Sequence, residues 1–184
     1  MMAYIGRHLG LDEVAATRLR QQYWSRYGAT LLGLMRHHDV DPDHFLWHTH
    51  QFTDIDRMVV AERGLKTMLQ RLPGRKILFS NAPRHYVDTL LAILGIDHCF
   101  SSIYTIERLR YRPKPAISGF LRLLRHERLD PHRCIMVEDT LDNLKTARAL
   151  RMKTVWVSTR TRRSPYVDVQ ITSILDLPKR LGQL

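Results

Sequence analysis

Three short segments carry polar side chains whose types could act together on a phosphate group. In chain order they are residues 77–81, 113–115 and 136–140, and Asn143 follows the last of them. Each segment places a small polar, cationic or anionic group at the end of an expected strand or on the loop beside it. A hydroxyl, an amine and a carboxylate pair that converge on one sheet edge are what phosphoryl chemistry with a divalent metal ion requires.

Ser80 and Asn81 follow directly on the apolar run at residues 76–79. Their hydroxyl and side-chain amide can hold phosphate oxygens without adding charge. Serine and asparagine are also common in ordinary turns between a strand and a helix, so this pair taken alone favours a turn.

Lys114 lies between Pro113 and Pro115. The two prolines restrict the local backbone and help to aim the lysine, whose ammonium can neutralise a phosphoryl group and a nearby carboxylate. A surface lysine in a loop explains this segment equally well when it is taken alone.

Glu138 and Asp139 end the strongest expected strand, residues 134–137. Their hard oxygen atoms suit Mg²⁺, which takes one or two carboxylates together with water and substrate phosphate. Asn143, four residues past Asp139, can face the same site from the first turn of the next helix. A helix N-terminus with favourable dipole interactions is the alternative, and we favour the metal site.

The elements that must position these groups follow from the apolar spacing. Residues 1–72 are predicted to be helical, with one helix over residues 29–38 and another over residues 57–72. After residue 73 the pattern alternates between strands and helices, which predicts a parallel, doubly wound α/β sheet. The expected strands are 76–79, 102–105, 134–137 and 154–157, and the expected helices are 85–94, 115–126 and 141–150. In such sheets ligands bind beyond the carboxyl ends of the strands, where all three segments lie.

Composition predicts one globular domain, or one core with a smaller cap. The chain has 184 residues, of which 44% are hydrophobic and 26% are charged. No apolar run approaches the ~20 residues that span a bilayer. The first residues lack the apolar stretch of a signal peptide, so we expect a cytoplasmic protein. The two cysteines, Cys99 and Cys134, form no CxxC pair and are expected to be reduced.

The formal net charge is +11, from 29 Lys and Arg against 18 Asp and Glu. Such a charge raises affinity for polyanions and speeds encounter with phosphorylated substrates. The cationic residues are scattered, and the densest cluster is Arg160, Arg162 and Arg163. Because no nucleic-acid-binding motif accompanies them, a solvated basic surface is favoured over a nucleic-acid interface.

Taken together, the three segments resemble the haloacid dehalogenase-like hydrolase superfamily over roughly residues 75–158. By this resemblance, Ser80 is similar to the hydroxyl of the second family motif and Lys114 to the lysine of the third. Glu138 and Asp139 are similar to the acids of the fourth motif.

The resemblance implies a Rossmann-like α/β core at residues 73–184 and an N-terminal helical cap at residues 1–72. The implied activity is Mg²⁺-dependent hydrolysis of a small phosphomonoester. No membrane partner is expected. The implied site residues fall into three groups: Ser80 and Lys114 as catalytic groups; Ser80, Asn81 and Lys114 as substrate-binding groups; and Asp139 and Glu138 as metal ligands, supported by Asn143. Oligomeric state is left open.

A finer resemblance points to the pyrimidine 5'-nucleotidase branch of this superfamily. It rests on residues 23–31, 48–50, 80–82 and 137–144. That branch dephosphorylates nucleoside monophosphates such as UMP and CMP, so a nucleoside monophosphate is the expected substrate.

The chain departs from the family at its first motif, an apolar strand that ends in Asp-x-Asp near the N-terminus. In the family the first of these aspartates attacks phosphorus, and the second is the general acid and base. The two Asp-x-Asp strings here, residues 41–43 and 54–56, follow no buried-strand pattern and are expected in the cap or in turns. The nucleophile is therefore not assigned, and catalysis by this chain is in question.

The missing motif also has a structural consequence. In the family its strand lies between the strands that bear the second and fourth motifs. Without it those two strands would lack their shared neighbour, leaving unpaired backbone groups or a collapsed gap. Our hypothesis is that Met1 is an internal methionine of a longer gene product, which an in-frame strand ending in Asp-x-Asp just upstream would support.

Other interpretations stay open. One is a non-catalytic phosphate- or nucleotide-binding protein that keeps the pocket without the nucleophile, and a weaker one is a basic nucleic-acid binder. His44 and His48 could share a helical face as zinc ligands, but no carboxylate or cysteine pattern completes such a site. The aromatic residues of the cap could stack on a base, although burial is the default for Trp24, Tyr27, Phe45 and Trp47.

Overall fold

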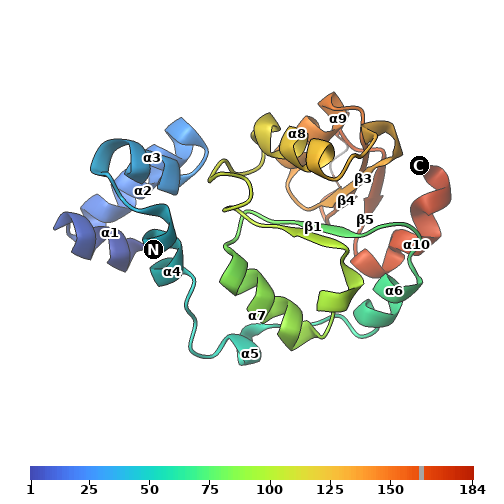
Figure 1. Cartoon of the computed structure of the whole chain (residues 1–184), viewed down its shortest axis with the longest axis horizontal. Coiled ribbons are helices and arrows are strands. Elements are labelled where there is room, and N and C mark those ends of the chain that lie inside the picture. The colour runs from blue at the N-terminus through green and yellow to red at the C-terminus, as the bar shows by residue number, and fades with distance from the viewer. Residues whose placement is uncertain (162–163) are drawn as a thin grey trace.

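The computed structural model describes residues 1–161 and 164–184, and it places a group of helices beside a parallel α/β core (Figure 1). Arg162 and Arg163 of the predicted basic cluster lie outside the described residues. Within the described part of the chain, no helix is long and apolar enough to cross a bilayer.

Six helices precede the first strand in the described chain, which agrees with the prediction that this region is helical. They are α1 (Met2–Leu9), α2 (Glu13–Tyr27), α3 (Thr30–His38), α4 (Pro42–Thr49), α5 (Ile55–Met58) and α6 (Leu65–Arg71). The single helix expected over residues 57–72 is wrong, because α5 ends at Met58 and α6 begins at Leu65. Gly64 adopts a left-handed conformation (φ 96°) at the start of α6. The apolar side chains before it, such as Met58 and Val60, are exposed, so burial does not stabilise a continuous helix there.

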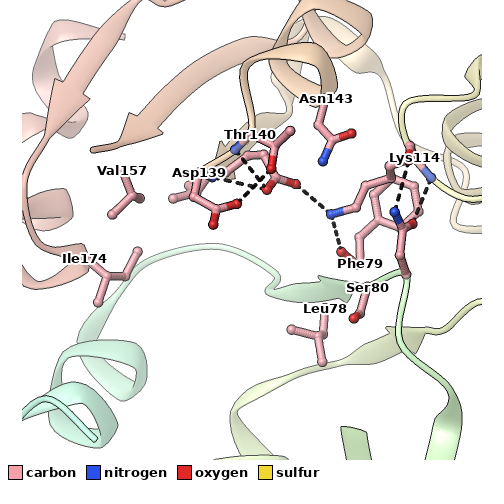
Figure 2. A pocket seen from close by; sticks show the side chains of 12 residues that line it. Leu78, Phe79, Ser80, Lys114, Asp139, Thr140, Asn143, Val157 and Ile174 are labelled. Carbon is pink, nitrogen blue, oxygen red and sulfur yellow. Dashed lines mark hydrogen bonds and ion pairs between the residues drawn. The ribbon is translucent and has the colours of Figure 1, made fainter. Parts of the chain in front are cut away.

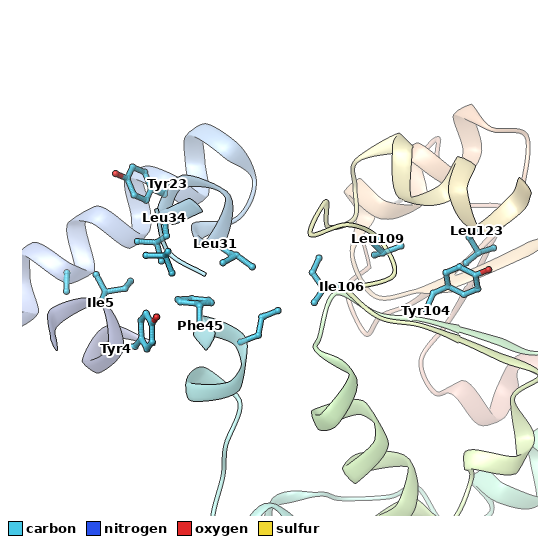
Figure 3. Packing of buried hydrophobic residues seen from close by; sticks show 13 residues of the cluster. Tyr4, Ile5, Tyr23, Leu31, Leu34, Phe45, Tyr104, Ile106, Leu109 and Leu123 are labelled. Atoms are coloured by element: carbon cyan, nitrogen blue, oxygen red, sulfur yellow. The ribbon is translucent and has the colours of Figure 1, made fainter. Parts of the chain in front are cut away.

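Helices α1 to α4 pack around an apolar centre of their own. Figure 3 shows Ile5, Leu34 and Phe45 pointing into it, and all three are buried. Gly33 allows α3 to approach α2 closely, because a Cβ atom there would lie 2.2 Å from Cγ of Tyr23. The Tyr23 hydroxyl lies 2.7 Å from Nε2 of His38, which ties α2 to the end of α3.

The remainder of the chain alternates between strands and helices, so the predicted α/β class is confirmed. The strands are β1 (Ile77–Phe79), β2 (Ser102–Tyr104), β3 (Ile135–Glu138), β4 (Lys153–Val157) and β5 (Val169–Ile171). Four of these were predicted. The fifth, β5, was missed, because it has only three residues and its Gln170 interrupts the apolar run.

These strands form two separate parallel sheets, β1–β2 and β3–β4–β5. The main helices that pack on them are α7 (Arg84–Leu94), α8 (Ile117–His126), α9 (Leu141–Ala149) and α10 (Leu177–Arg180). Figure 1 shows α8 and α9 on one side of the strands and α6, α7 and α10 on the other. The sheets are therefore covered on both faces, as parallel sheets require.

Asp168 ties the loop before β5 to β4 and α9. Its Oδ2 accepts hydrogen bonds from the backbone N–H and the hydroxyl of Thr154, at 2.8 and 2.9 Å, and its carboxylate pairs with Arg148. Burial alone would raise the pKa of Asp168, but the hydrogen bonds from Thr154 and Arg148 outweigh it and lower the pKa below its usual value.

Asp168→Asn is therefore expected to lower the free energy of unfolding by about 1–2 kcal/mol at neutral pH. A lowered folded-state pKa means that the carboxylate stabilises above its unfolded pKa of about 3.9, and this contribution is lost as the pH falls through the folded value. The difference between wild type and variant should thus shrink below about pH 4 in urea unfolding at several pH values. The control is Asp176→Asn, whose pair with Lys179 spans 3.8 Å at the surface and should matter little. A pH-independent difference would contradict the assignment.

Candidate functional site

The predicted site residues meet in one cavity of about 470 Å³ between the two sheets, at the carboxyl ends of β1 and β3 (Figure 2). It is lined by Ser80, Asn81, Lys114, Glu138, Asp139 and Asn143. These residues come from three segments that are far apart in sequence: the loop after β1, the loop that carries Lys114, and the end of β3 with the start of α9. The parallel strands bring them together because their carboxyl ends meet at the same edge.

Lys114 lies at the centre of this cavity. Its Nζ donates to Oε2 of Glu138 at 2.6 Å and to the backbone oxygen of Phe79 at 2.7 Å, so it bridges the ends of β3 and β1. The side chains of Lys114 and Glu138 are each only 9% exposed. The ammonium has three protons and these contacts use two, which leaves one for a ligand.

Asn81 holds the Lys114 loop rather than pointing freely into the cavity. Its Oδ1 accepts from the backbone N–H of Lys114 at 2.7 Å, and its Nδ2 donates to the backbone oxygen of the same residue at 3.0 Å. This two-point contact joins residues that are 33 apart in sequence. It fixes the Lys114 backbone, from which the side chain that carries the ammonium extends. The predicted direct contact of Asn81 with substrate stays a prediction.

Ser80 has a hydroxyl proton available for a ligand. Its Oγ accepts a hydrogen bond from the backbone N–H of Ala82 at 3.1 Å, which is the turn contact that serine often makes. The backbone N–H of Ser80 donates to Tyr104 and so extends the β1–β2 ladder by one residue. Ser80 can therefore stabilise the turn and still donate its hydroxyl proton to a ligand.

The two acids differ in their surroundings. Glu138 is fully engaged, because its Oε1 accepts from the backbone N–H groups of Asp139 and Thr140 while Oε2 binds Lys114. Asp139 is exposed, and its Oδ1 accepts a hydrogen bond from the Thr140 hydroxyl at 3.2 Å. Hydrogen bonding with Glu138, and then with Thr140, lowers the pKa of Asp139, and the charge of Lys114 acts in the same direction. Asp139 is thus an ionised carboxylate with an oxygen to offer.

Asn143 lines the cavity and contains a buried oxygen without a partner among the described residues. The residue is 6% exposed, and its Oδ1 has no hydrogen-bond partner among the described residues. Figure 2 shows the side chain reaching from α9 toward Lys114 and the acids. Because an unpaired buried oxygen is costly, this atom indicates that something polar belongs here.

Sequence reasoning missed Trp156 as part of the site. Its Nε1 donates to the backbone oxygen of Asp139 at 2.9 Å and so holds the loop that carries the acids. A second hollow of about 570 Å³ lies beside the first; it shares Asp139 and includes Trp156 and Arg160. The available signal was a tryptophan near the carboxyl end of a buried strand.

Other candidates lie elsewhere. Asp41 accepts a hydrogen bond from the backbone N–H of His44 at 2.7 Å at the start of α4, and Asp54 precedes the short α5, so both Asp-x-Asp strings begin next to helices and neither follows a strand. Neither Asp-x-Asp string lines the cavity. The His44 and His48 rings meet edge to face with centroids 4.4 Å apart, and the described residues hold no group of three metal-binding side chains. Trp24 and Trp47 are exposed, which corrects their expected burial, whereas Phe45 is buried.

Comparison with known proteins identifies the fold. A model of the haloacid dehalogenase-like hydrolase family matches residues 4–151. The chain belongs to this family. The resemblance stated from three short segments is therefore confirmed at the level of the superfamily, and hydrolase is the class of protein that the match supports.

Solved structures of this family have the same fold. A phosphatase from Thermococcus onnurineus is 18% identical, with a TM-score of 0.68; the match covers 99% of this chain and 86% of that one. A haloacid dehalogenase-like protein of unknown function from Agrobacterium tumefaciens is 20% identical over 92% and 91% of the two chains, with a TM-score of 0.59. An L-2-haloacid dehalogenase from Xanthobacter autotrophicus with covalently bound chloropropionic acid is 14% identical over 92% and 86%, with a TM-score of 0.62.

Proposed function

We propose that this site serves Mg²⁺-dependent hydrolysis of phosphomonoesters, with pyrimidine nucleoside 5'-monophosphates such as UMP and CMP as substrates. The observation that carries the proposal is Lys114, whose buried ammonium keeps one free proton beside the Ser80 hydroxyl and the Asp139 carboxylate on one cavity. A phosphoryl group needs this combination of a cation, a neutral donor and a metal ligand. Dehalogenases also occur among the structural neighbours, so the fold alone does not select the substrate class. We choose a phosphate ester over a haloacid because of Lys114, Ser80 and Asp139.

Each residue has a distinct role in the proposed reaction. Ser80 donates its hydroxyl proton to a phosphoryl oxygen, and Lys114 balances the charge that develops on the phosphoryl group. Asn81 positions Lys114 through the two contacts to its backbone. We keep the division into a helical cap at residues 1–72 and a core at residues 73–184 as part of this proposal, with the cap closing over the base. A cytoplasmic location stays a prediction from the sequence.

The residues present suit a magnesium ion. Asp139 offers an ionised carboxylate oxygen on the cavity, and Glu138 assists by holding Lys114 and the Asp139 backbone. Asn143 lines the same cavity, and its buried amide oxygen has no partner among the described residues. Mg²⁺ commonly takes one or two carboxylates and completes its shell with water and phosphate. Bound there, it would supply a positive charge that polarises the phosphoryl oxygens.

The test is phosphate release from UMP and CMP with Mg²⁺, together with the shift in melting temperature that Mg²⁺ causes. Asp139→Asn is expected to raise the Mg²⁺ concentration that gives half of the shift in melting temperature by at least about tenfold. The matched control is Asp142→Asn, an exposed acid on the first turn of α9 that does not line the cavity and should behave as wild type. An unchanged shift in Asp139→Asn would overturn the metal assignment.

Phosphate release decides between two forms of the proposal. Activity that Asp139→Asn abolishes would mean that an unassigned group attacks phosphorus. Binding of UMP without release would favour the second candidate, a non-catalytic nucleotide-binding protein. One observation favours that candidate: among the described residues, the carboxylates that line the cavity are Glu138, which is paired with Lys114, and Asp139, which is assigned to the metal. A nucleic-acid binder would instead show binding that weakens steeply with salt and survives Asp139→Asn.

A further inference from the structure

The chain between β2 and α8 begins with a compact turn, residues 105–112, which we call the 105–112 turn. The backbone N–H of Tyr111 donates to the C=O of Ile106 at 2.9 Å, and three further backbone hydrogen bonds lie wholly within the turn. Because its backbone is bonded to itself, the turn moves as one body. Lys114 follows two residues after it, beyond Pro113, whose ring restricts the connecting backbone.

The 105–112 turn contacts both of the neighbouring segments that carry site residues. The N–H of Ile106 donates to the C=O of Ala82 at 3.2 Å, in the loop after β1. Oε1 of Glu107 accepts from the backbone N–H of Arg84 at 2.8 Å, at the start of α7. The other end of the turn leads directly to the Lys114 loop. A displacement of the turn is therefore passed to the Lys114 loop and to the loop after β1.

The same turn is bonded to the cap. The Tyr111 hydroxyl donates to Oδ1 of Asp43 at 2.7 Å, on the first turn of α4. Among the described residues, this is the one hydrogen bond that the structure records between helices α1–α4 and the chain from β1 onward. Ile106 and Leu109 are buried in one apolar cluster with these helices, and Figure 3 shows Ile106 facing Leu31 across the boundary. Tyr111 and Asp43 thus add a directional contact to an apolar one.

The backbone of the turn is strained at the residue that makes this contact. Arg110 and Tyr111 have φ values of 53° and 56°, in the left-handed region that residues other than glycine adopt rarely. Two such residues in succession persist only where neighbouring contacts hold them. Burial raises the pKa of the Tyr111 hydroxyl, and the hydrogen bond to Asp43 raises it further, so the group stays a donor at neutral pH. The contact with Asp43 can therefore hold the strained turn throughout the neutral range.

We propose that Tyr111 is a positioning residue that couples the docked cap to the placement of Lys114. While its hydroxyl is bonded to Asp43, the strained turn is held and the Lys114 ammonium reaches Glu138 and the C=O of Phe79. When the cap separates, the turn relaxes to a less strained backbone and the ammonium loses this placement. The site is then complete only with the cap docked. This inference goes beyond the proposed hydrolysis, because it concerns how the cation is placed for any ligand of the cavity.

The experiment compares backbone amide hydrogen exchange in wild type and in Tyr111→Phe, which removes the hydroxyl and keeps the ring. The readout is exchange at the amides of Ile106 and Lys114, which donate to the loop after β1 and to Asn81. We expect exchange at both amides to become faster by about tenfold or more, the size expected for the loss of a hydrogen bond to a charged acceptor. Amides of β4 and of α2 should exchange as in wild type, because the core and the cap each stay folded.

The matched control is Tyr86→Phe. Tyr86 is a half-buried tyrosine of α7 on the same boundary, where its ring contacts the rings of His50 and Phe52. Unlike the Tyr111 hydroxyl, its hydroxyl has no recorded hydrogen bond within the part of the chain that the structure describes. Removing it should therefore leave exchange at the two amides unchanged.

Variants of the acceptor separate coupling from a merely structural role. Asp43→Ala should reproduce the effect of Tyr111→Phe, and the double variant should add nothing to either, because all three remove the same contact. Asp43→Asn keeps an acceptor oxygen and should restore part of the protection at Lys114, since only the charge is lost. Unchanged exchange at Lys114 in Tyr111→Phe and Asp43→Ala would overturn the coupling. So would an increase that β4 shares equally, because it would report global destabilisation.

These outcomes are independent of the proposed hydrolysis. Amide exchange is measured without Mg²⁺ or UMP, and phosphate release by the unmodified chain is measured without these variants. Failure of the coupling is seen as unchanged exchange at Lys114. Failure of the proposed function is seen in wild type, as the absence of Mg²⁺-dependent stabilisation or of nucleotide binding, so each failure can be told from the other.

Discussion

Lys114→Met is expected to lower the free energy of unfolding by about 3–5 kcal/mol, which is the cost of breaking a buried ion pair by removing one partner. Lys114 and Glu138 are 2.6 Å apart and each is 9% exposed, so the variant leaves an uncompensated carboxylate inside the protein. Methionine keeps the length of the stem, and the loss is therefore of charge and hydrogen bonds rather than of packing. The C=O of Phe79 loses its donor at the same time.

Urea unfolding followed by circular dichroism measures this effect. The control is Lys66→Met, which removes the same charge from an exposed position on α6 and should change the free energy of unfolding by less than about 0.5 kcal/mol. The double variant Lys114→Met/Glu138→Gln should recover part of the loss, because it removes the charge that Lys114→Met leaves unpaired. A loss of less than about 1 kcal/mol in Lys114→Met would show that the pair is solvated in solution.

Gly33→Ala is expected to destabilise the helical cap by up to about 3 kcal/mol. The added Cβ atom would lie 2.2, 2.4 and 2.6 Å from three carbon atoms of Tyr23, and two of these belong to the ring at its attachment point. These atoms cannot swing aside as the end of a flexible chain can, so α2 and α3 must separate or the ring must leave its place. Either change breaks the 2.7 Å contact between the Tyr23 hydroxyl and His38.

Hydrogen exchange is measured in α2 and α3 and compared with that in β3 and β4. The comparison separates a local effect on the two helices from global unfolding. The matched control is Gly182→Ala, where an added Cβ atom has no neighbour within 4 Å. This control should leave both regions unchanged. Equal protection of α2 in Gly33→Ala and in wild type would contradict the close approach of the two helices.

Local patterns in the sequence were enough to predict most of the strands and helices, and the residues singled out for chemistry line one cavity. The apolar runs that became β1, β3 and β4 are short, rich in Ile and Val, and end in polar residues, so their type and their carboxyl ends could be read directly. Helix boundaries followed where a capping residue marks them, as Asp41 does for α4. The prediction was wrong at residues 57–72, where helix-forming residues occur without an apolar face to bury, and β5 was too short to detect.

The sequence by itself determined which groups could do chemistry: the Ser80 hydroxyl, the Lys114 ammonium and the acids at the end of β3. This information is local, because residue type and distance from the end of a strand are properties of a few neighbouring residues. Only the tertiary structure decided how these groups act on one another. Asn81 binds the backbone of Lys114, Glu138 is committed to Lys114, and Asp139 is the carboxylate left with an oxygen to offer. The division of the strands into two sheets, β1–β2 and β3–β4–β5, is likewise a matter of pairing between distant strands, which depends on how the whole chain packs and not on any one segment.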